Sequence, residues 1–238
     1  AARQAWVPVS PGSMDLDGDG TDDLLGSDLS MEKTAEAETL SNFKGVAVTA
    51  VNRDDVKTIA VSAGGGGAVG INVSGSVNVI TTDTLAHIDD GARINALDVN
   101  EGSGQAVLVA AGNDLYHLGI AAGISVAGAV AVTPGADVTV LTGNTQAYVD
   151  DGARIEAKQD IWVTANASEN VLVVAAGAAS GSVAVGGAFG VIVIDNTTRS
   201  YIGNSDGSDG GATALAGGNI LISASDHTET FMVDGSLG

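Results

Sequence analysis

Large apolar residues alternate with small or polar residues in three stretches of the chain, 71–79, 124–132 and 183–191. A period of two predicts β-strands that carry large side chains on one face and small ones on the other. We expect the large, branched face to line the interior and the polar face of the first copy to contact water. The small face of the third copy is alanine and glycine, which predicts that another sheet or another chain covers it. The small or polar face consists of Asn72, Ser74, Ser76 and Asn78 in the first copy and of Ala184, Gly186, Ala188 and Gly190 in the third.

A shorter motif follows each of these strands and marks an internal repeat. Residues 84–94 and 145–155 are similar and lie 61 positions apart, and a third copy begins at residue 198 and is interrupted by the insertion NSDGSDGG. Further apolar stretches give about five short strands in each repeat, without helical segments between them. Units of this kind bury their apolar faces by stacking on one another. The sequence therefore predicts an all-β fold, a right-handed parallel β-solenoid (β-helix) of ~61-residue repeats, with two or three coils in each repeat.

The repeats divide the chain into an N-terminal segment, 1–42, and a solenoid, 43–238. The expected repeats are 43–96, 97–157, 158–216 and a partial repeat, 217–238. Residues 27–40 form the one helix-like stretch, which is short enough to cap the solenoid. Residues 171–194 carry no charge and are long enough for a membrane helix, but their alternation, β-branched residues and glycines favour strands.

Residues 15–23 read DLDGDGTDD, the spacing of a calcium-binding loop. Calcium takes six to eight oxygen ligands, and this spacing brings carboxylates together around a sharp turn at Gly20. Gly26 stands where an EF-hand has its bidentate glutamate, so the loop is more similar to the DxDxDGxxD loops of β-propeller and linker modules. The alternative is an acidic linker without a metal. The predicted Ca²⁺ ligands are Asp15, Asp17, Asp19, the carbonyl of Thr21, and Asp23.

Composition narrows the class of protein further. The chain has 238 residues and a formal net charge of −20, which disfavours nucleic acid and anionic membranes as partners. Its 34 glycines and few aromatic residues are typical of thin β-layers rather than of a compact enzyme core. The absence of cysteine excludes disulfides and thiolate metal sites. No secretion leader opens the chain, so we expect that a leader was removed or that the chain is an internal piece of a longer protein.

Paired aspartates occupy the repeated turns at Asp89 and Asp90 and at Asp150 and Asp151. Asp beside Gly is typical of turns, where the carboxylate accepts backbone hydrogen bonds. Calcium bridging between successive turns and carboxylate catalysis on a polysaccharide are the alternatives. Within the insertion, Asp206 and Asp209 resemble a loose calcium loop but lack the glycine-rich repeat of calcium β-rolls.

Other reactive residues have structural interpretations. His87 occupies the repeat position of Tyr148 and Tyr201, so we expect a ring packed at a corner of the fold. Arg93 and Arg154 repeat in register and are expected to pair with nearby aspartates. Neither a zinc site, a nucleophile motif nor a phosphate-binding loop is predicted, since the glycines at 64–67 precede no helix.

The succession T-x-A-Y-V-D-D-G-A-R-I-x-A, D-I-W-V-T-A, V-L-V-V-A-A-G and S-V-A-V-G-G-A-F-G-V-I-V-I-D-N-T-T resembles the repeats of very large secreted bacterial surface proteins, including filamentous adhesins of the leukotoxin type. The resemblance covers about residues 43–238. It implies export, a parallel β-helix, and attachment or assembly at a cell surface.

The sequence thus favours a non-enzymatic, calcium-stabilised structural or adhesive segment of an extracellular cell-surface protein. Its expected partners are other copies of itself or adjoining repeats, and host or cell-surface receptors or glycans, without nucleic acid or membrane insertion. One alternative is the subunit of an extracellular filament assembled by head-to-tail strand stacking. A second alternative is a polysaccharide-acting β-helix enzyme.

Overall fold

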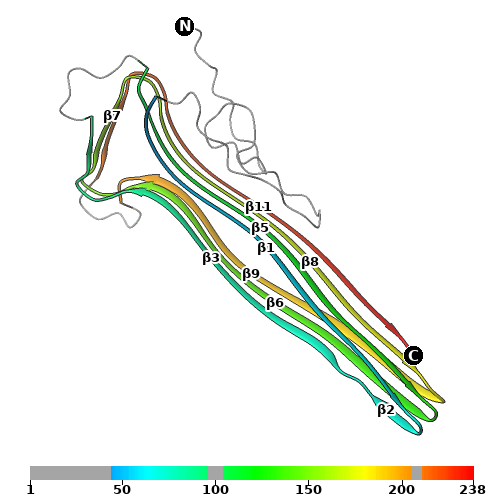
Figure 1. The fold of residues 1–238 in the computed structure, drawn as a ribbon. Coiled ribbons are helices and arrows are strands. Elements are labelled where there is room, and N and C mark those ends of the chain that lie inside the picture. The colour runs from blue at the N-terminus through cyan, green and yellow to red at the C-terminus, as the bar shows by residue number, and fades with distance from the viewer. Residues whose placement is uncertain (1–43, 96–103, 205–210) are drawn as a thin grey trace.

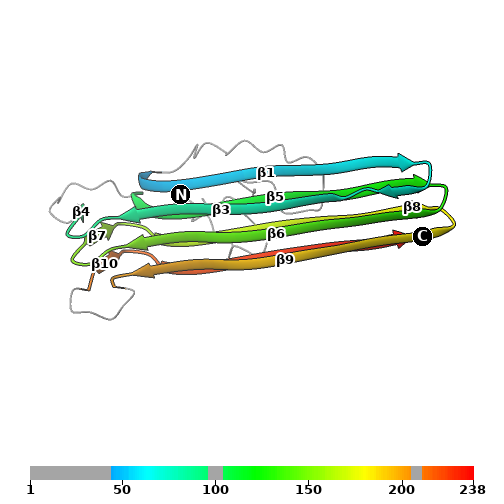
Figure 2. The ribbon, with the colours of Figure 1, turned by 90° about the horizontal axis from the view of Figure 1, so that it is seen from below.

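The fold is built from long parallel strands arranged in two facing layers (Figures 1 and 2). The structure is a computed structural model that describes residues 44–95, 104–204 and 211–238. Every regular element in these ranges is a β-strand, and none of the described residues forms a helix able to cross a membrane. The prediction of an all-β protein is therefore confirmed.

The strands of the described residues form three parallel sheets. The first sheet has the order β1 (Gly45–Gly66), β5 (Ala106–Ala127), β8 (Ile161–Ser180) and β11 (Ile220–Leu237). In the second sheet β6 (Val130–Val149) pairs with β2 (Val69–Ile71) and β3 (Ser74–Ile88) on one side and with β9 (Val183–Ile202) on the other. The small third sheet has the order β4 (Arg93–Ile94), β7 (Arg154–Ala157) and β10 (Thr213–Ala216). All of these pairs are parallel, as the repeat pattern predicts.

Each of the three full repeats contributes to all three sheets, the first repeat by the two strands β2 and β3 in the second sheet, and the partial last repeat contributes β11 alone. Ser74 lies beside Gly135, the residue 61 positions later, and the same offset relates β1 to β5. Two long strands and one short strand therefore replace the five short strands expected, and the expectation of two or three coils in each repeat is wrong. The long strands continue through polar segments that resemble turns in the sequence. In β1, the Asn52 amide donates to Asn113 Oδ1 of β5 at 3.0 Å, so the polar residues stay in the ladder.

A tight turn joins the two long strands of a repeat at the end of the molecule that we call the tip. Glycine is required there, because a Cβ on Gly66 would lie 2.0 Å from the carbonyl oxygen of Val69. The stretch 171–194 also spans such a turn, with its first part in β8 and its second part in β9. This confirms that it forms strands.

The two faces of the tip strands are the reverse of the prediction. Val77 exposes 74% of its surface, whereas its neighbour Asn78 exposes 8%. The large face therefore points outward and the small or polar face points between the sheets. The reason is the close approach of the sheets: a Cβ on Gly177 would lie 2.4 Å from the carbonyl oxygen of Gly187 on the facing strand. Only glycine fits at this position, and the neighbouring positions of the small face take alanine or glycine instead of valine. The prediction that another sheet covers the small face of the third copy is confirmed.

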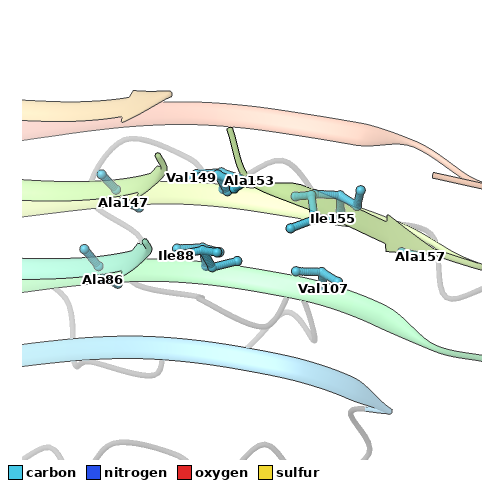
Figure 3. Close-up of a cluster of buried hydrophobic side chains, with 13 residues drawn as sticks. Ala86, Ile88, Val107, Ala147, Val149, Ala153, Ile155 and Ala157 are labelled. Carbon is cyan, nitrogen blue, oxygen red and sulfur yellow. The ribbon is translucent and has the colours of Figure 1, made fainter. Parts of the chain in front are cut away.

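A hydrophobic core lies at the opposite end of the molecule, where the third sheet closes the space between the layers (Figure 3). Its side chains come from all three sheets: Val107 from the first, Val149 from the second and Ile155 from the third, each with no exposed surface. Burial of these side chains stabilises this end of the fold by about 25 cal/mol for each Å² of apolar area removed from water.

Candidate functional site

Two clusters of polar side chains lie between the two long sheets, beside a small hydrophobic cluster of Leu115, Leu141, Val171 and Val173. The first of two clusters surrounds Asp137, a fully buried residue of β6. Its carboxylate accepts hydrogen bonds from Thr139 Oγ1 at 3.0 Å and Asn78 Nδ2 at 3.5 Å, and a short one from the Ser76 hydroxyl. Ser76 and Asn78 belong to the neighbouring strand β3, so the buried charge links two successive repeats of the second sheet.

His117 joins this cluster to the first sheet. Its Nδ1 lies 3.1 Å from the carbonyl oxygen of Val56, and its Nε2 lies 3.1 Å from Thr139 Oγ1. Burial lowers the pKa of His117, while the Val56 carbonyl and the charge of Asp137 act in the opposite direction. Because a carbonyl only accepts, Nδ1 carries a proton. The imidazole thus holds the two sheets together across the interior.

The second cluster contains two carboxyl groups, Glu169 of β8 and Asp226 of β11. Glu169 exposes only 1% of its surface. The hydroxyl of Thr228 lies 3.1 Å from an oxygen of each carboxyl group, and Thr198 Oγ1 donates to Asp226 at 2.7 Å. Asn113 Nδ2 lies 3.5 Å from Glu169 Oε1. This cluster joins the third and fourth strands of the first sheet to β9 of the second.

Burial raises the pKa of Glu169 to about 7, and the negative charge of Asp226 adds to the increase. Hydrogen bonds from Thr228 and Asn113 favour the charged carboxylate but do not outweigh burial. Glu169 can therefore hold a proton near neutral pH.

The chemistry of these clusters is that of buried hydrogen bonding. The part of the chain that the structure describes contains no group of three or more His, Cys, Asp or Glu side chains placed to hold a metal ion. Asp137 and Glu169 are enclosed between the sheets, with 0% and 1% of their surfaces exposed, and so face no solvent-filled groove. The hydrogen bonds of both clusters connect neighbouring strands and the two long sheets.

The predicted calcium ligands Asp15, Asp17, Asp19, Thr21 and Asp23 lie outside the described residues. The same is true of Asp206 and Asp209 in the insertion and of the helix-like stretch 27–40.

The paired aspartates lie in turns that stack on one another. The backbone amide of Ala92 donates to the carbonyl oxygen of Asp89 at 3.1 Å, and Asp150 Oδ1 accepts from the backbone amide of Asp151 at 2.9 Å. The glycines of both turns have positive φ angles, 66° at Gly91 and 64° at Gly152. This geometry agrees with the interpretation of these residues as turn formers.

The three aromatic rings at the repeated corner form a stack. The ring of Tyr148 lies 5.0 Å from the ring of His87 on one side and 5.0 Å from that of Tyr201 on the other. The predicted equivalence of His87 with the two tyrosines is confirmed. The prediction for Arg154 is wrong, because its guanidinium pairs with Glu156 at 2.5 Å instead of with an aspartate. Glu156 lies two residues further along the same strand face, within easy reach of the arginine.

Sequence reasoning missed Asp137, His117 and Glu169 as interior residues. Two signals were available. Asn52 and Asn113 recur 61 residues apart, which marks a polar ladder within the strands. Asp137 follows the alternation of the strand 130–140 on the small face, where Ala131 and Thr133 precede it.

Comparison with models of known families, with curated proteins and with solved structures finds no match to this chain. The proposals below therefore rest on the sequence and on the geometry alone.

Proposed function

We propose that the chain is a structural segment of an extracellular bacterial surface protein, serving adhesion or assembly. In this proposal residues 43–238 form a right-handed parallel β-solenoid with one turn for each repeat, and the loop 15–23 binds calcium at its N-terminal end. The observation that carries the proposal is the parallel register, in which each long strand lies beside its equivalent one repeat later. Such stacking produces a scaffold that can be lengthened by adding repeats.

The contacts between successive strands support a structural role. Identical or equivalent side chains lie side by side, as in the Asn52–Asn113 hydrogen bond and the rings of His87, Tyr148 and Tyr201. These ladders stabilise the stack, which supports a structural role for the repeats. The net charge of −20 favours solubility of a long scaffold.

Insertion of extra repeats tests the proposal. Three additional copies of residues 97–157 after residue 157 are expected to lengthen the stack by about 14 Å, because neighbouring strands lie about 4.8 Å apart. Small-angle scattering measures this dimension, and circular dichroism checks that strand content rises with it. The control inserts the same residues in scrambled order. A particle that becomes more compact, or an insert that remains unfolded, would contradict a modular solenoid.

Head-to-tail assembly into a filament is a second candidate. Among the described residues, β1 and β11 each have a strand partner on one side only, and so do β3 and β9 in the second sheet. Long edge strands of this kind can pair with another chain. On β11, Ile220 and Ile222 expose 46% and 47% of their surfaces at the edge of the interior, where a further strand would cover them.

A charge on this edge tests the filament. Ile222→Lys places a charge in the column that a following strand would cover, and charges at such edges prevent pairing. The filament model predicts long particles of wild-type chain by electron microscopy and short ones for Ile222→Lys. The control, Ser225→Lys, adds the same charge to the other face of β11. Single particles of wild-type chain at high concentration and high calcium would exclude the filament.

A further inference from the structure

The exterior of the second sheet carries a continuous apolar surface at its tip half. We call this surface the valine face. It consists of the outward residues of 69–79, 130–140 and 183–193, which are valine or isoleucine except for two glycines, an alanine, a proline and a phenylalanine. Three of its side chains, Val77, Val79 and Val185, expose 74%, 72% and 53% of their surfaces. The strand register aligns them in four rows, Val69–Val130–Val183, Ile71–Val132–Val185, Val77–Val138–Val191 and Val79–Val140–Val193.

The valine face ends abruptly. No outward residue within it is charged or hydrogen-bonding, although the chain carries a net charge of −20. The next outward row is Thr81, Thr142 and Asp195, and polar residues such as Asp83 and Asn144 follow. Water therefore contacts one half of the same strands through polar side chains and the other half through aliphatic ones.

Parallel sheets are usually covered on both faces. Here the first sheet covers one face of the second, and in the described chain the valine face is uncovered. Three strands about 4.8 Å apart and 11 residues long present about 500 Å². A patch of this size is near the upper limit for a monomer. Two such faces packed together bury about 1,000 Å² in total, which is enough for a specific interface.

A lipid surface does not suit this face. The strands at its two sides, β3 and β9, have open backbone edges among the described residues, and hydrocarbon cannot satisfy their N–H and C=O groups. A strongly acidic chain is also repelled by anionic lipid. A protein surface of matching shape avoids both costs.

The shape of the valine face is complementary to itself. Gly75, Ala136 and Phe189 occupy one row across the three strands, with the smallest residue at one side and the largest at the other. A Cβ on Gly75 would meet only a backbone oxygen at 3.4 Å, so its outer side is open. Phe189 exposes 54% of its surface. A two-fold axis that runs along β6 between two copies would place each phenylalanine over the other copy's glycine.

We propose that the valine face binds the same face of a second copy of this chain. The two copies pack with their strands in the same direction about a two-fold axis along β6. Phe189 of each copy fills the space over the partner's Gly75, and Ala136 lies at the centre. This lateral contact is distinct from head-to-tail stacking, which uses the strand edges, and it closes at two copies.

Sedimentation equilibrium of the full chain and its variants tests the interface. The wild-type chain is expected to have the mass of two copies at micromolar concentration. Val138→Asp inserts a charge into the centre of the face, and Gly75→Phe fills the space that receives Phe189. Each is expected to weaken the dimer at least about tenfold, as central interface residues do. Asn144→Asp, on the outward face of the same strand beyond the valine face, is the matched control and keeps the dimer.

Circular dichroism establishes that each variant is folded. The proposal is overturned by a wild-type chain that remains monomeric, or by dimers that persist in both Val138→Asp and Gly75→Phe. It is also overturned if the wild type floats with neutral phosphatidylcholine vesicles as a monomer, since lipid would then be the occupant. An open-ended series of masses that Ile222→Lys abolishes and Val138→Asp leaves unchanged would assign association to the strand edges instead.

Discussion

Asn78 and Asp137 lie on adjacent strands in the interior of the protein, and the asparagine amide donates to the aspartate carboxylate at 3.5 Å. Val77, the residue next to Asn78, points outward and exposes 74% of its surface. At the tip half, hydrogen bonds between polar side chains therefore take the place of a hydrophobic core. Removing one partner of such a network leaves buried groups unsatisfied, which makes these residues sensitive to mutation.

Asp137→Ala tests the importance of this network. The substitution leaves the side chains of Ser76, Asn78 and Thr139 without their shared acceptor in a buried position. We expect the free energy of unfolding to fall by about 3 kcal/mol, measured by urea denaturation. The exposed turn residue Asp89 is the control, and Asp89→Ala is expected to change the stability by less than about 0.5 kcal/mol. Equal effects of the two substitutions would show that the buried network contributes nothing special.

Two glycines provide a matched test of the close approach between the sheets. A Cβ on Gly177 would lie 2.4 Å and 2.5 Å from two backbone oxygens, whereas a Cβ on Gly235 would have no atom within 4 Å. Gly177→Ala is therefore expected to lower the free energy of unfolding by about 2 kcal/mol, because backbone cannot move aside easily. Gly235→Ala is expected to be neutral or slightly stabilising. Thermal unfolding of both variants measures the difference, and a neutral Gly177→Ala would mean that the sheets are further apart.

The period of two and the 61-residue repeat were sufficient to predict strands, parallel pairing and the equivalence of His87 with Tyr148 and Tyr201. These features depend on residues that are neighbours in sequence or in register, so the sequence pattern is enough to predict them. The aspartates of the turns were interpretable for the same reason, because Asp-Gly pairs satisfy backbone groups nearby.

The orientation of the faces was not predictable in this way. Large apolar residues normally point inward. In the tip strands they point outward, because the sheets approach so closely at Gly119, Gly177 and similar residues that large side chains do not fit between them. The pairing of His117 with Thr139 crosses from one sheet to the other and has no periodic signal. The length of β1 was also hidden, since its polar residues Asn52 and Asp54 are typical of turns until their partners in the interior are known.

Removal of calcium tests the predicted loop 15–23. If Asp15, Asp17, Asp19, Thr21 and Asp23 bind Ca²⁺, chelation is expected to lower the melting temperature by several degrees, because a ligand that binds the folded state stabilises it. Asp17→Ala removes a ligand and is expected to abolish the difference between calcium and chelator. Scanning calorimetry measures both, with Asp90→Ala as a control that keeps the calcium effect. A melting curve that chelation leaves unchanged in the wild type would refute the site.

The pH dependence of stability reports on Glu169. Burial and the charge of Asp226 raise its pKa from 4.5 to about 7 in the folded chain. The folded state then binds a proton more tightly than the unfolded state does. The resulting stabilisation is complete below about pH 4.5 and is lost as the pH rises to about 7. The full shift corresponds to at most about 3 kcal/mol.

Glu169→Gln keeps the shape and the hydrogen bonds of the protonated side chain and cannot ionise. We therefore expect the variant to be about as stable as the wild type at pH 5 and more stable at pH 8, by about 1 to 3 kcal/mol in urea denaturation. Glu156→Gln is the control, because Glu156 pairs with Arg154 at 2.5 Å and its side chain is 24% exposed. That variant is expected to retain the wild-type loss of stability between pH 5 and pH 8. If Glu169→Gln also retained it, Glu169 would be ionised throughout this range, and its negative charge would have to be stabilised by a cation or by water between β8 and β11.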